Sequence, residues 1–150
     1  MNYHTLRNPH WTGWSVVFGF IALWTLSGAV PGFLFPEWTY ESFYGHPAES
    51  QLIIDLFKGA WGQTLLFGLG YAFVALDPAR HGLISLLGGI GKIMFAARLL
   101  ITTKLEDFSG LSLLALGGDL LFAAAIFVFV FGTGQFYTYF KIVRESGTNG

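Results

Sequence analysis

The sequence predicts an all-α integral membrane protein, a four-helix bundle whose neighbouring spans run antiparallel. Of its 150 residues, 53% are hydrophobic and only 11% are charged, whereas roughly 25% of the residues in an ordinary soluble domain are charged. Mean hydropathy is +0.57, so the polar surface that a soluble domain needs is missing. In addition, four apolar segments reach the length of about 20 residues that a helix needs to cross a bilayer.

The same composition excludes several classes of function. A formal net charge of −1 offers no basic surface, so we exclude nucleic acid as a partner. The chain has no cysteine, which rules out disulfides, thiolate metal sites and iron–sulfur clusters.

The apolar segments are predicted to be helices, because they show none of the alternation of a lumen-facing barrel strand. The first resembles a signal peptide in that Arg7 precedes it, but its apolar stretch continues to Phe35, so we interpret it as a span. The four form one transmembrane domain over residues 1–150. The predicted spans run from Trp14 to about Phe35, from Asp55 to Leu76, from Gly82 to Thr102 and from Gly110 to Phe131.

The connections predict the topology. Pro78 stops a helix from continuing through residues 76–81, so the second and third spans are expected to be antiparallel neighbours. Basic residues favour the cytoplasmic side of short connections. We therefore expect a multi-pass protein of the cytoplasmic (inner) membrane with both termini in the cytoplasm. The basic residues on that side are Arg7, Arg80, Lys141 and Arg144, against Lys104 on the other side.

Aromatic residues and the tail fit the same topology. We expect residues 135–144 to form a short helix at the cytoplasmic interface, because they mix aromatic with basic side chains. Tryptophan and tyrosine prefer membrane interfaces. The residues that we place there are Trp11, Trp14, Trp38, Tyr40, Tyr44, Tyr71, Tyr137 and Tyr139.

Two charged residues lie where a span should be apolar. Lys92 is ten residues from the cytoplasmic end of the third span, and Asp119 is twelve residues from the cytoplasmic end of the fourth. At about 1.5 Å per residue, their depths differ by roughly 3 Å. Because a charge at mid-bilayer costs about 2.5–3.5 kcal/mol on insertion scales, we predict a buried Lys92–Asp119 ion pair.

Small side chains share a helical face with each of these charges, which allows close contact between helices. In the second span, Gln63 lies about 12 Å from the start, at nearly the same depth as the pair. We therefore predict Gln63 as the third member of a polar layer, on a stripe with Gly59, Leu66 and Gly70. The small residues are Ser85, Gly88 or Gly89, and Ala96 in the third span, and Ser112, Ala115 and Ala123 in the fourth.

Two interpretations of the polar layer remain open. The pair either fixes the helix register or forms a proton or ligand site, of which a Schiff base on Lys92 with Asp119 as counter-ion is one form. Three further charged residues, Asp55, Lys58 and Arg98, lie near the non-cytoplasmic span ends. They can extend to the lipid headgroups, and Arg98 can alternatively pair with Asp55.

Other motifs favour no catalytic or metal site. The segment before Lys92 lacks a glycine of the phosphate loop, and Ile93 stands where that loop has a hydroxyl residue. All four histidines lie outside the spans, which excludes haem held between the helices.

Two polar clusters outside the spans have ordinary interpretations. The first long loop has a single nitrogen ligand, so we favour a solvated loop over a metal site. At the proline turn we favour a capping Asp77 and two cytoplasmic anchors over an acid–base site. The loop residues are Glu37, Glu41, His46 and Glu49, and the anchors are Arg80 and His81.

Three motifs together resemble a pattern of small uncharacterised bacterial four-helix inner-membrane proteins, loosely similar to the DoxX-like group. They are Asp77-Pro78-x-Arg80-His81, Gly88-x-x-Gly91-Lys92 and Gly118-Asp119-Leu120-Leu121-Phe122, and the resemblance covers roughly Lys58 to Phe131. The resemblance implies that Lys92 and Asp119 belong to the framework of the group. It implies no single activity, although some relatives are linked to quinone or redox systems.

We therefore expect a small, non-catalytic membrane protein that acts as an accessory subunit or as a lipid- or quinone-binding module. The alternatives are a proton-coupled carrier of small solutes built on the Lys92–Asp119 pair, and a membrane-embedded enzyme acting on a lipid-like substrate. No metal or other cofactor is predicted, apart from a quinone or lipid as ligand. The expected partners are membrane lipids and either a larger membrane complex or further copies of the chain.

Overall fold

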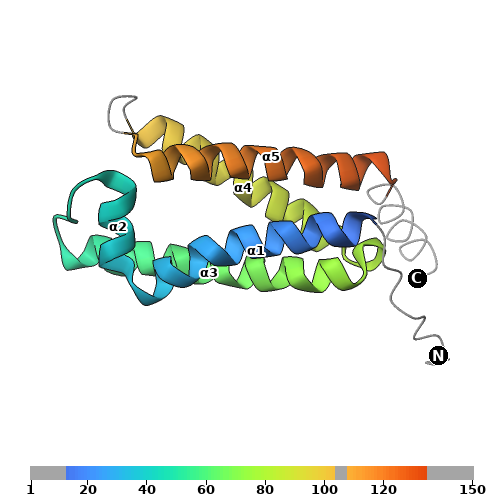
Figure 1. The fold of residues 1–150 in the computed structure, drawn as a ribbon, viewed down its shortest axis with the longest axis horizontal. Helices are drawn as coiled ribbons and strands as arrows, with labels where there is room; N and C mark the ends of the chain where they lie inside the picture. Colours follow the sequence, from blue (N-terminus) through green and yellow to red (C-terminus); the bar gives the residue numbers. More distant parts are fainter. Residues whose placement is uncertain (1–12, 104–107, 135–150) are drawn as a thin grey trace, which may run out of the picture.

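The computed structural model describes residues 13–103 and 108–134, which form α-helices joined by short connections, with no strand among these residues (Figure 1). Four of the helices are long and apolar enough to cross a membrane. This confirms the predicted all-α bundle with four candidate spans. The elements are α1 (Gly13–Leu34), α2 (Pro36–Tyr44), α3 (Gln51–Leu76), the short 3-10 helix η1 (Pro78–Arg80), α4 (Gly82–Thr102) and α5 (Gly110–Gly132).

The four long helices are arranged as two antiparallel pairs. Helix α3 lies beside α1, and α5 lies beside α4 (Figure 1). Helix α4 crosses obliquely, so it is close to α3 near η1 and further from it toward the α2 end. The predicted antiparallel order of the second and third spans is present, but the principal partner of α3 is α1 rather than α4.

The loop before α3 differs from the prediction, because it contains helix α2 and because α3 begins at Gln51 rather than Asp55. Pro36 occupies the first turn of α2, where its missing N–H costs nothing. Gly45 ends the helix with a φ of 75°, a left-handed conformation that suits glycine. The predicted interfacial helix at residues 135–144 lies outside the described residues.

Large side chains set against glycines hold α1 and α3 together. The Trp61 indole packs directly against Gly32, and its ring edge lies 3.2 Å from the position that a Cβ on Gly28 would take. On the opposite helix, Leu26 packs against Gly68, 2.7 Å from the corresponding Cβ position. Such close contacts matter in lipid, where helix association relies on van der Waals packing.

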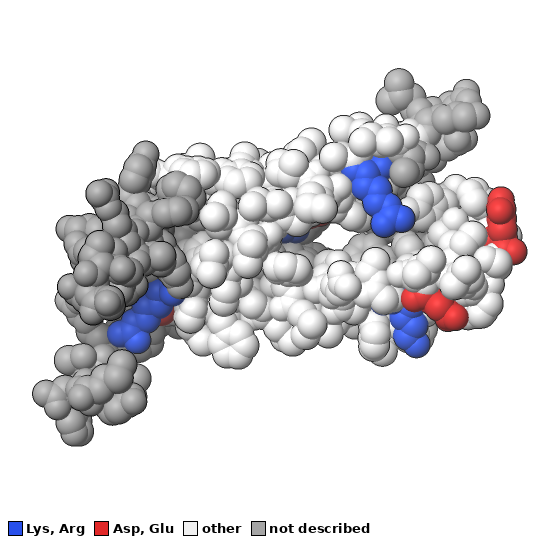
Figure 2. Space-filling model, turned by 180° about the vertical axis from the view of Figure 1, so that it is seen from behind, with Lys and Arg blue, Asp and Glu red and all other residues white. Residues whose placement is uncertain are grey.

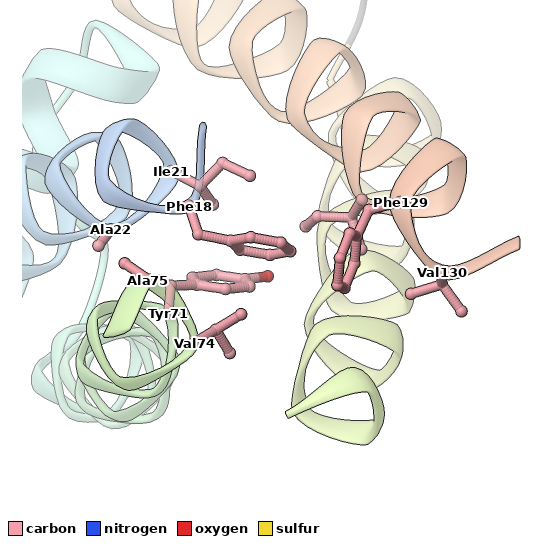
Figure 3. Packing of buried hydrophobic residues seen from close by; sticks show 9 residues of the cluster. Phe18, Ile21, Ala22, Tyr71, Val74, Ala75, Phe129 and Val130 are labelled. Carbon is pink, nitrogen blue, oxygen red and sulfur yellow. The ribbon is translucent and has the colours of Figure 1, made fainter. Parts of the chain in front are cut away.

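A hydrophobic core of aliphatic and aromatic side chains joins the two pairs near the η1 end (Figure 3). Phe18 of α1 meets Phe129 of α5 edge to face with ring centroids 5.0 Å apart, and it stacks on Tyr71 of α3 at 6.4 Å. Edge-to-face pairs of this kind are favourable beyond the area that they bury. The core residues are Phe18, Ile21, Ala22, Tyr71, Val74, Ala75, Ile126, Phe129 and Val130.

The outward faces of the long helices are strongly apolar. Leu23 is 66% exposed, Leu66 is 68% exposed and Ile101 is 83% exposed. An apolar surface that continues around all four long helices suits acyl chains rather than water.

Candidate functional site

The predicted ion pair is present. Lys92 Nζ of α4 lies 2.6 Å from Asp119 Oδ1 of α5, and the two side chains are 7% and 15% exposed. The small residues that share their helical faces are buried or half-buried. These residues let α4 and α5 approach closely enough for the short Lys92 and Asp119 contact to form.

A tryptophan of α1 completes the environment of the carboxylate. The Trp24 indole N–H donates to Asp119 Oδ1 at 3.1 Å. The indole packs against Gly118, where a Cβ would overlap its ring, and against the Phe122 ring at 5.7 Å. The Trp24 and Lys92 hydrogen bonds both go to Oδ1, so Asp119 Oδ2 is engaged by neither.

A tyrosine of α3 supplies the fourth side of this centre. Tyr71 is 1% exposed, and Lys92 Nζ lies 5.9 Å from the centroid of its ring. Its hydroxyl packs against Gly88 and has no hydrogen-bond partner among the residues that the structure describes. Tyr71, which we expected near a membrane interface, turns its ring inward and packs on Phe18 (Figure 3).

Gln63 is the member of the predicted layer that the structure places elsewhere. Its side chain is exposed, as are Gly59 and Leu66 of the same stripe. The prediction is wrong because α3 meets its neighbours through a different face, which carries Trp61, Gly68 and Tyr71. The polar centre (Trp24, Tyr71, Lys92 and Asp119) therefore takes one side chain from each long helix.

The surface of the molecule is hollowed between the helix pairs (Figure 2). Figure 2 shows the surface hollowed between the two pairs toward the α2 end, with small basic and acidic patches deep beside the opening. On this side the pairs are joined by Trp61 of α3 and Phe95 of α4, whose ring centroids are 6.3 Å apart. The oblique course of α4 leaves the space that Figure 2 shows.

The other charged residues lie toward the ends of the spans, as expected. Asp55 is exposed and accepts a hydrogen bond from the Gln51 amide at 3.1 Å. Lys58 is also exposed, with its Nζ 5.4 Å from the centroid of the Phe33 ring. Arg98 is exposed on α4.

The proline turn and the outer loop contribute no second centre to the described part of the chain. Asp77 is the N-cap residue of η1, but its side chain pairs with Arg80 Nε at 3.0 Å and makes no cap hydrogen bond. A carboxylate within reach of a guanidinium gains more from that bond than from a neutral N–H. Glu37 and Glu41 line a pocket between α2 and α3, but no group of three or more His, Asp or Glu among the described residues is arranged to hold a metal.

Two signals in the sequence could have identified the missed members of the centre. Trp24 lies in the middle of the first predicted span, whereas tryptophan in membrane proteins prefers the interfaces. A mid-span tryptophan therefore indicates an internal hydrogen bond or a packing role. Tyr71 gives a weaker signal, since it lies only five residues from the end of α3.

The fold and the site define the class of the protein: it is a multi-pass all-α membrane protein with a polar centre between its spans. Comparisons with known protein families, with curated proteins and with solved structures found no match.

Proposed function

We propose that this chain is a non-catalytic membrane protein that binds a lipid or quinone at its polar centre and serves as an accessory module of a larger membrane assembly. The observation that carries the proposal is the buried Lys92–Asp119 pair between α4 and α5, in a molecule whose surface is hollowed between its helix pairs (Figure 2). A lipid-like molecule entering from the bilayer would place its polar end beside charged groups and its chain along apolar surfaces. The resemblance to DoxX-like proteins agrees with this proposal but does not carry it.

The hydrogen-bonding capacity of the centre supports ligand binding over a purely structural role. An ammonium group has three N–H donors and a carboxylate has two acceptor oxygens. Lys92 directs one donor at Asp119, while Asp119 receives both of its bonds on a single oxygen. A pair that only fixes the helix register needs no further hydrogen-bond donors or acceptors. A ligand site needs them to bind its ligand.

Lipid analysis of the purified protein tests the proposal. The full-length protein is extracted in a mild detergent, and the retained lipids and quinones are identified by mass spectrometry. We expect one lipid or quinone class to be enriched in the wild type and lost in the Lys92→Met/Asp119→Leu double variant. Gln63→Leu is the matched control, because it removes a polar side chain of the exposed face at a similar depth. Equal lipid content in all three proteins would contradict the proposal.

A proton-coupled carrier is the second candidate, and the buried, titratable Lys92–Asp119 pair is the observation that favours it. Reconstitution into liposomes that contain a pH-sensitive dye separates the two functions. A carrier moves protons when its solute is added, and the double variant does not. A binding module retains its lipid and moves no protons.

The accessory role has its own test. We propose that the protein lies in the cytoplasmic membrane, with both termini in the cytoplasm, and contacts a partner through its exposed apolar faces. Purification from native membranes under mild conditions should then recover it in a larger complex. Recovery as a single chain at every detergent concentration would contradict the accessory role and leave lipid binding untouched.

A further inference from the structure

The Tyr71 hydroxyl is a buried polar group of the centre that no bond satisfies within the described part of the chain. The residue is 1% exposed, and its oxygen has no hydrogen-bond partner among residues 13–103 and 108–134. A buried hydroxyl without a partner costs free energy, and more so inside a bilayer, where water is scarce. The group is therefore positioned for a partner outside the described residues.

The orientation of Tyr71 directs this hydroxyl toward the other helix pair. In Figure 3 the side chain extends from α3 toward α4 and α5, and its oxygen lies at the far end of the ring. Gly88 provides the room, since a Cβ at that position would overlap the hydroxyl. Lys92, one helical turn further along α4, has its Nζ 5.9 Å from the centroid of the Tyr71 ring. The Tyr71 hydroxyl and the Lys92 ammonium, two hydrogen-bond donors from different helices, therefore both lie at the part of α4 that carries Gly88 and Lys92.

We propose that Tyr71 is a ligand-contacting residue, and that the centre accepts an uncharged head group with a carbonyl or hydroxyl oxygen. This proposal rests on the proposed lipid- or quinone-binding function and specifies the chemistry of its ligand. The ligand oxygen accepts a hydrogen bond from the Tyr71 hydroxyl beside the Lys92 ammonium.

Charge balance excludes the other head groups. Lys92 and Asp119 cancel each other, and the other two members of the centre, Trp24 and Tyr71, carry no charge in their ordinary states. An anionic or cationic head group would leave one unpaired charge in a low-dielectric site, which is costly at mid-membrane. A neutral oxygen acceptor fills the missing hydrogen bond without adding charge.

A set of probes with matched chains tests this preference. Hexadecanol, hexadecyl sulfate and hexadecyltrimethylammonium share one chain and differ in head-group charge, and a decyl-substituted benzoquinone supplies a carbonyl instead of a hydroxyl. Each is titrated into the full-length protein in lipid nanodiscs, with tryptophan fluorescence as the readout because the Trp24 indole is bonded to Asp119. We expect saturable binding of hexadecanol or the quinone, and binding at least about tenfold weaker for both charged probes. Whichever neutral probe binds more tightly identifies the ligand oxygen as a hydroxyl or a carbonyl.

The Tyr71→Phe variant tests the contact itself. Loss of one hydrogen bond should weaken binding of the neutral probe by about 3- to 10-fold. Tyr44→Phe, in α2 outside the long helices, is the matched control and should bind as the wild type does. If Tyr71→Phe does not fold, the tyrosine C–O stretching band of the wild type decides: a shift when hexadecanol or the quinone is added is expected, and no shift contradicts the contact.

The outcomes separate the two proposals. Preferred binding of a charged probe, or unchanged affinity in Tyr71→Phe, overturns the inference about Tyr71 and leaves lipid binding intact. If no probe binds and the purified wild type retains no lipid class, the proposed lipid-binding function fails together with the inference about Tyr71.

Discussion

The two helix pairs are held together by different physical means. Helices α1 and α3 meet through large side chains set against glycines, and α1 carries no charged residue. Helices α4 and α5 meet through small residues and the Lys92–Asp119 ion pair. Apolar side chains can repack partly after a substitution, so some stability is kept. Removing either partner of a buried ion pair leaves an unpaired buried charge, which is strongly destabilising. The comparison shows that the chain concentrates its polar chemistry in the pair that crosses obliquely and leaves a hollow.

Removing one charge from α4 or α5 should have the largest effect on stability. Lys92→Met or Asp119→Leu leaves the other charge buried and uncompensated, which costs about 3–5 kcal/mol in soluble cores. Unfolding in mixed micelles measures the loss. Lys58→Met and Asp55→Leu are the matched controls, since both residues are exposed, and each should change stability by less than about 0.5 kcal/mol. Equal losses at the two sets of positions would mean that burial of the pair has no energetic consequence.

The glycines of α1 should show effects of opposite sign. Gly32→Ala places a Cβ into the Trp61 indole, so we expect a loss of about 1–3 kcal/mol from overpacking. Gly19→Ala is the control in the same helix, because nothing lies within 4 Å of its Cβ position. There the better helix propensity of alanine should raise stability by about 0.5–1 kcal/mol. The same sign at both positions would argue against glycine-dependent packing of α1 on α3.

Trp24 joins the two pairs, and its replacement should have a smaller effect. Trp24→Phe keeps an aromatic ring but removes the indole N–H that Asp119 accepts. Hydrogen bonds between membrane helices contribute about 0.6–2 kcal/mol, so we expect a loss in that range. A loss of the same size in a protein that already carries Asp119→Leu would show that the hydrogen bond is not its cause.

The sequence predicts most of this arrangement. The long helices follow from the apolar runs, and the Lys92–Asp119 pair follows from matching depths in two helices joined by a short turn. The Gln63 prediction is wrong because glycine spacing indicates a smooth helix face without indicating which neighbour covers it. The roles of Trp24 and Tyr71 could not be predicted because both depend on contacts between α1, α3 and the other pair, which are distant in sequence.

The smallest expected effect is a change of stability at alkaline pH, which arises from a tyrosine of helix α2. Burial in the aromatic cluster with Tyr40 raises the pKa of Tyr44 above its ordinary value of 10.0, the nearby Arg98 opposes this rise, and Tyr40 adds to it. A raised folded-state pKa means that the stability contributed by neutral Tyr44 is present below pH 10.0 and is lost as the pH rises through the folded-state value. Tyr44→Phe should therefore lose less stability than the wild type above about pH 10. Identical alkaline unfolding of the two proteins would contradict the assignment.

The central claim is that Lys92 and Asp119 act as one unit in the polar centre. A double-mutant cycle of Lys92→Met, Asp119→Leu and the double variant measures their coupling in the free energy of unfolding. We predict that the double variant is more stable than either single variant, because no unpaired charge remains, and that the coupling energy is about 2 kcal/mol or more. Losses that add to within about 0.5 kcal/mol would show that the two residues do not interact, and would contradict the account.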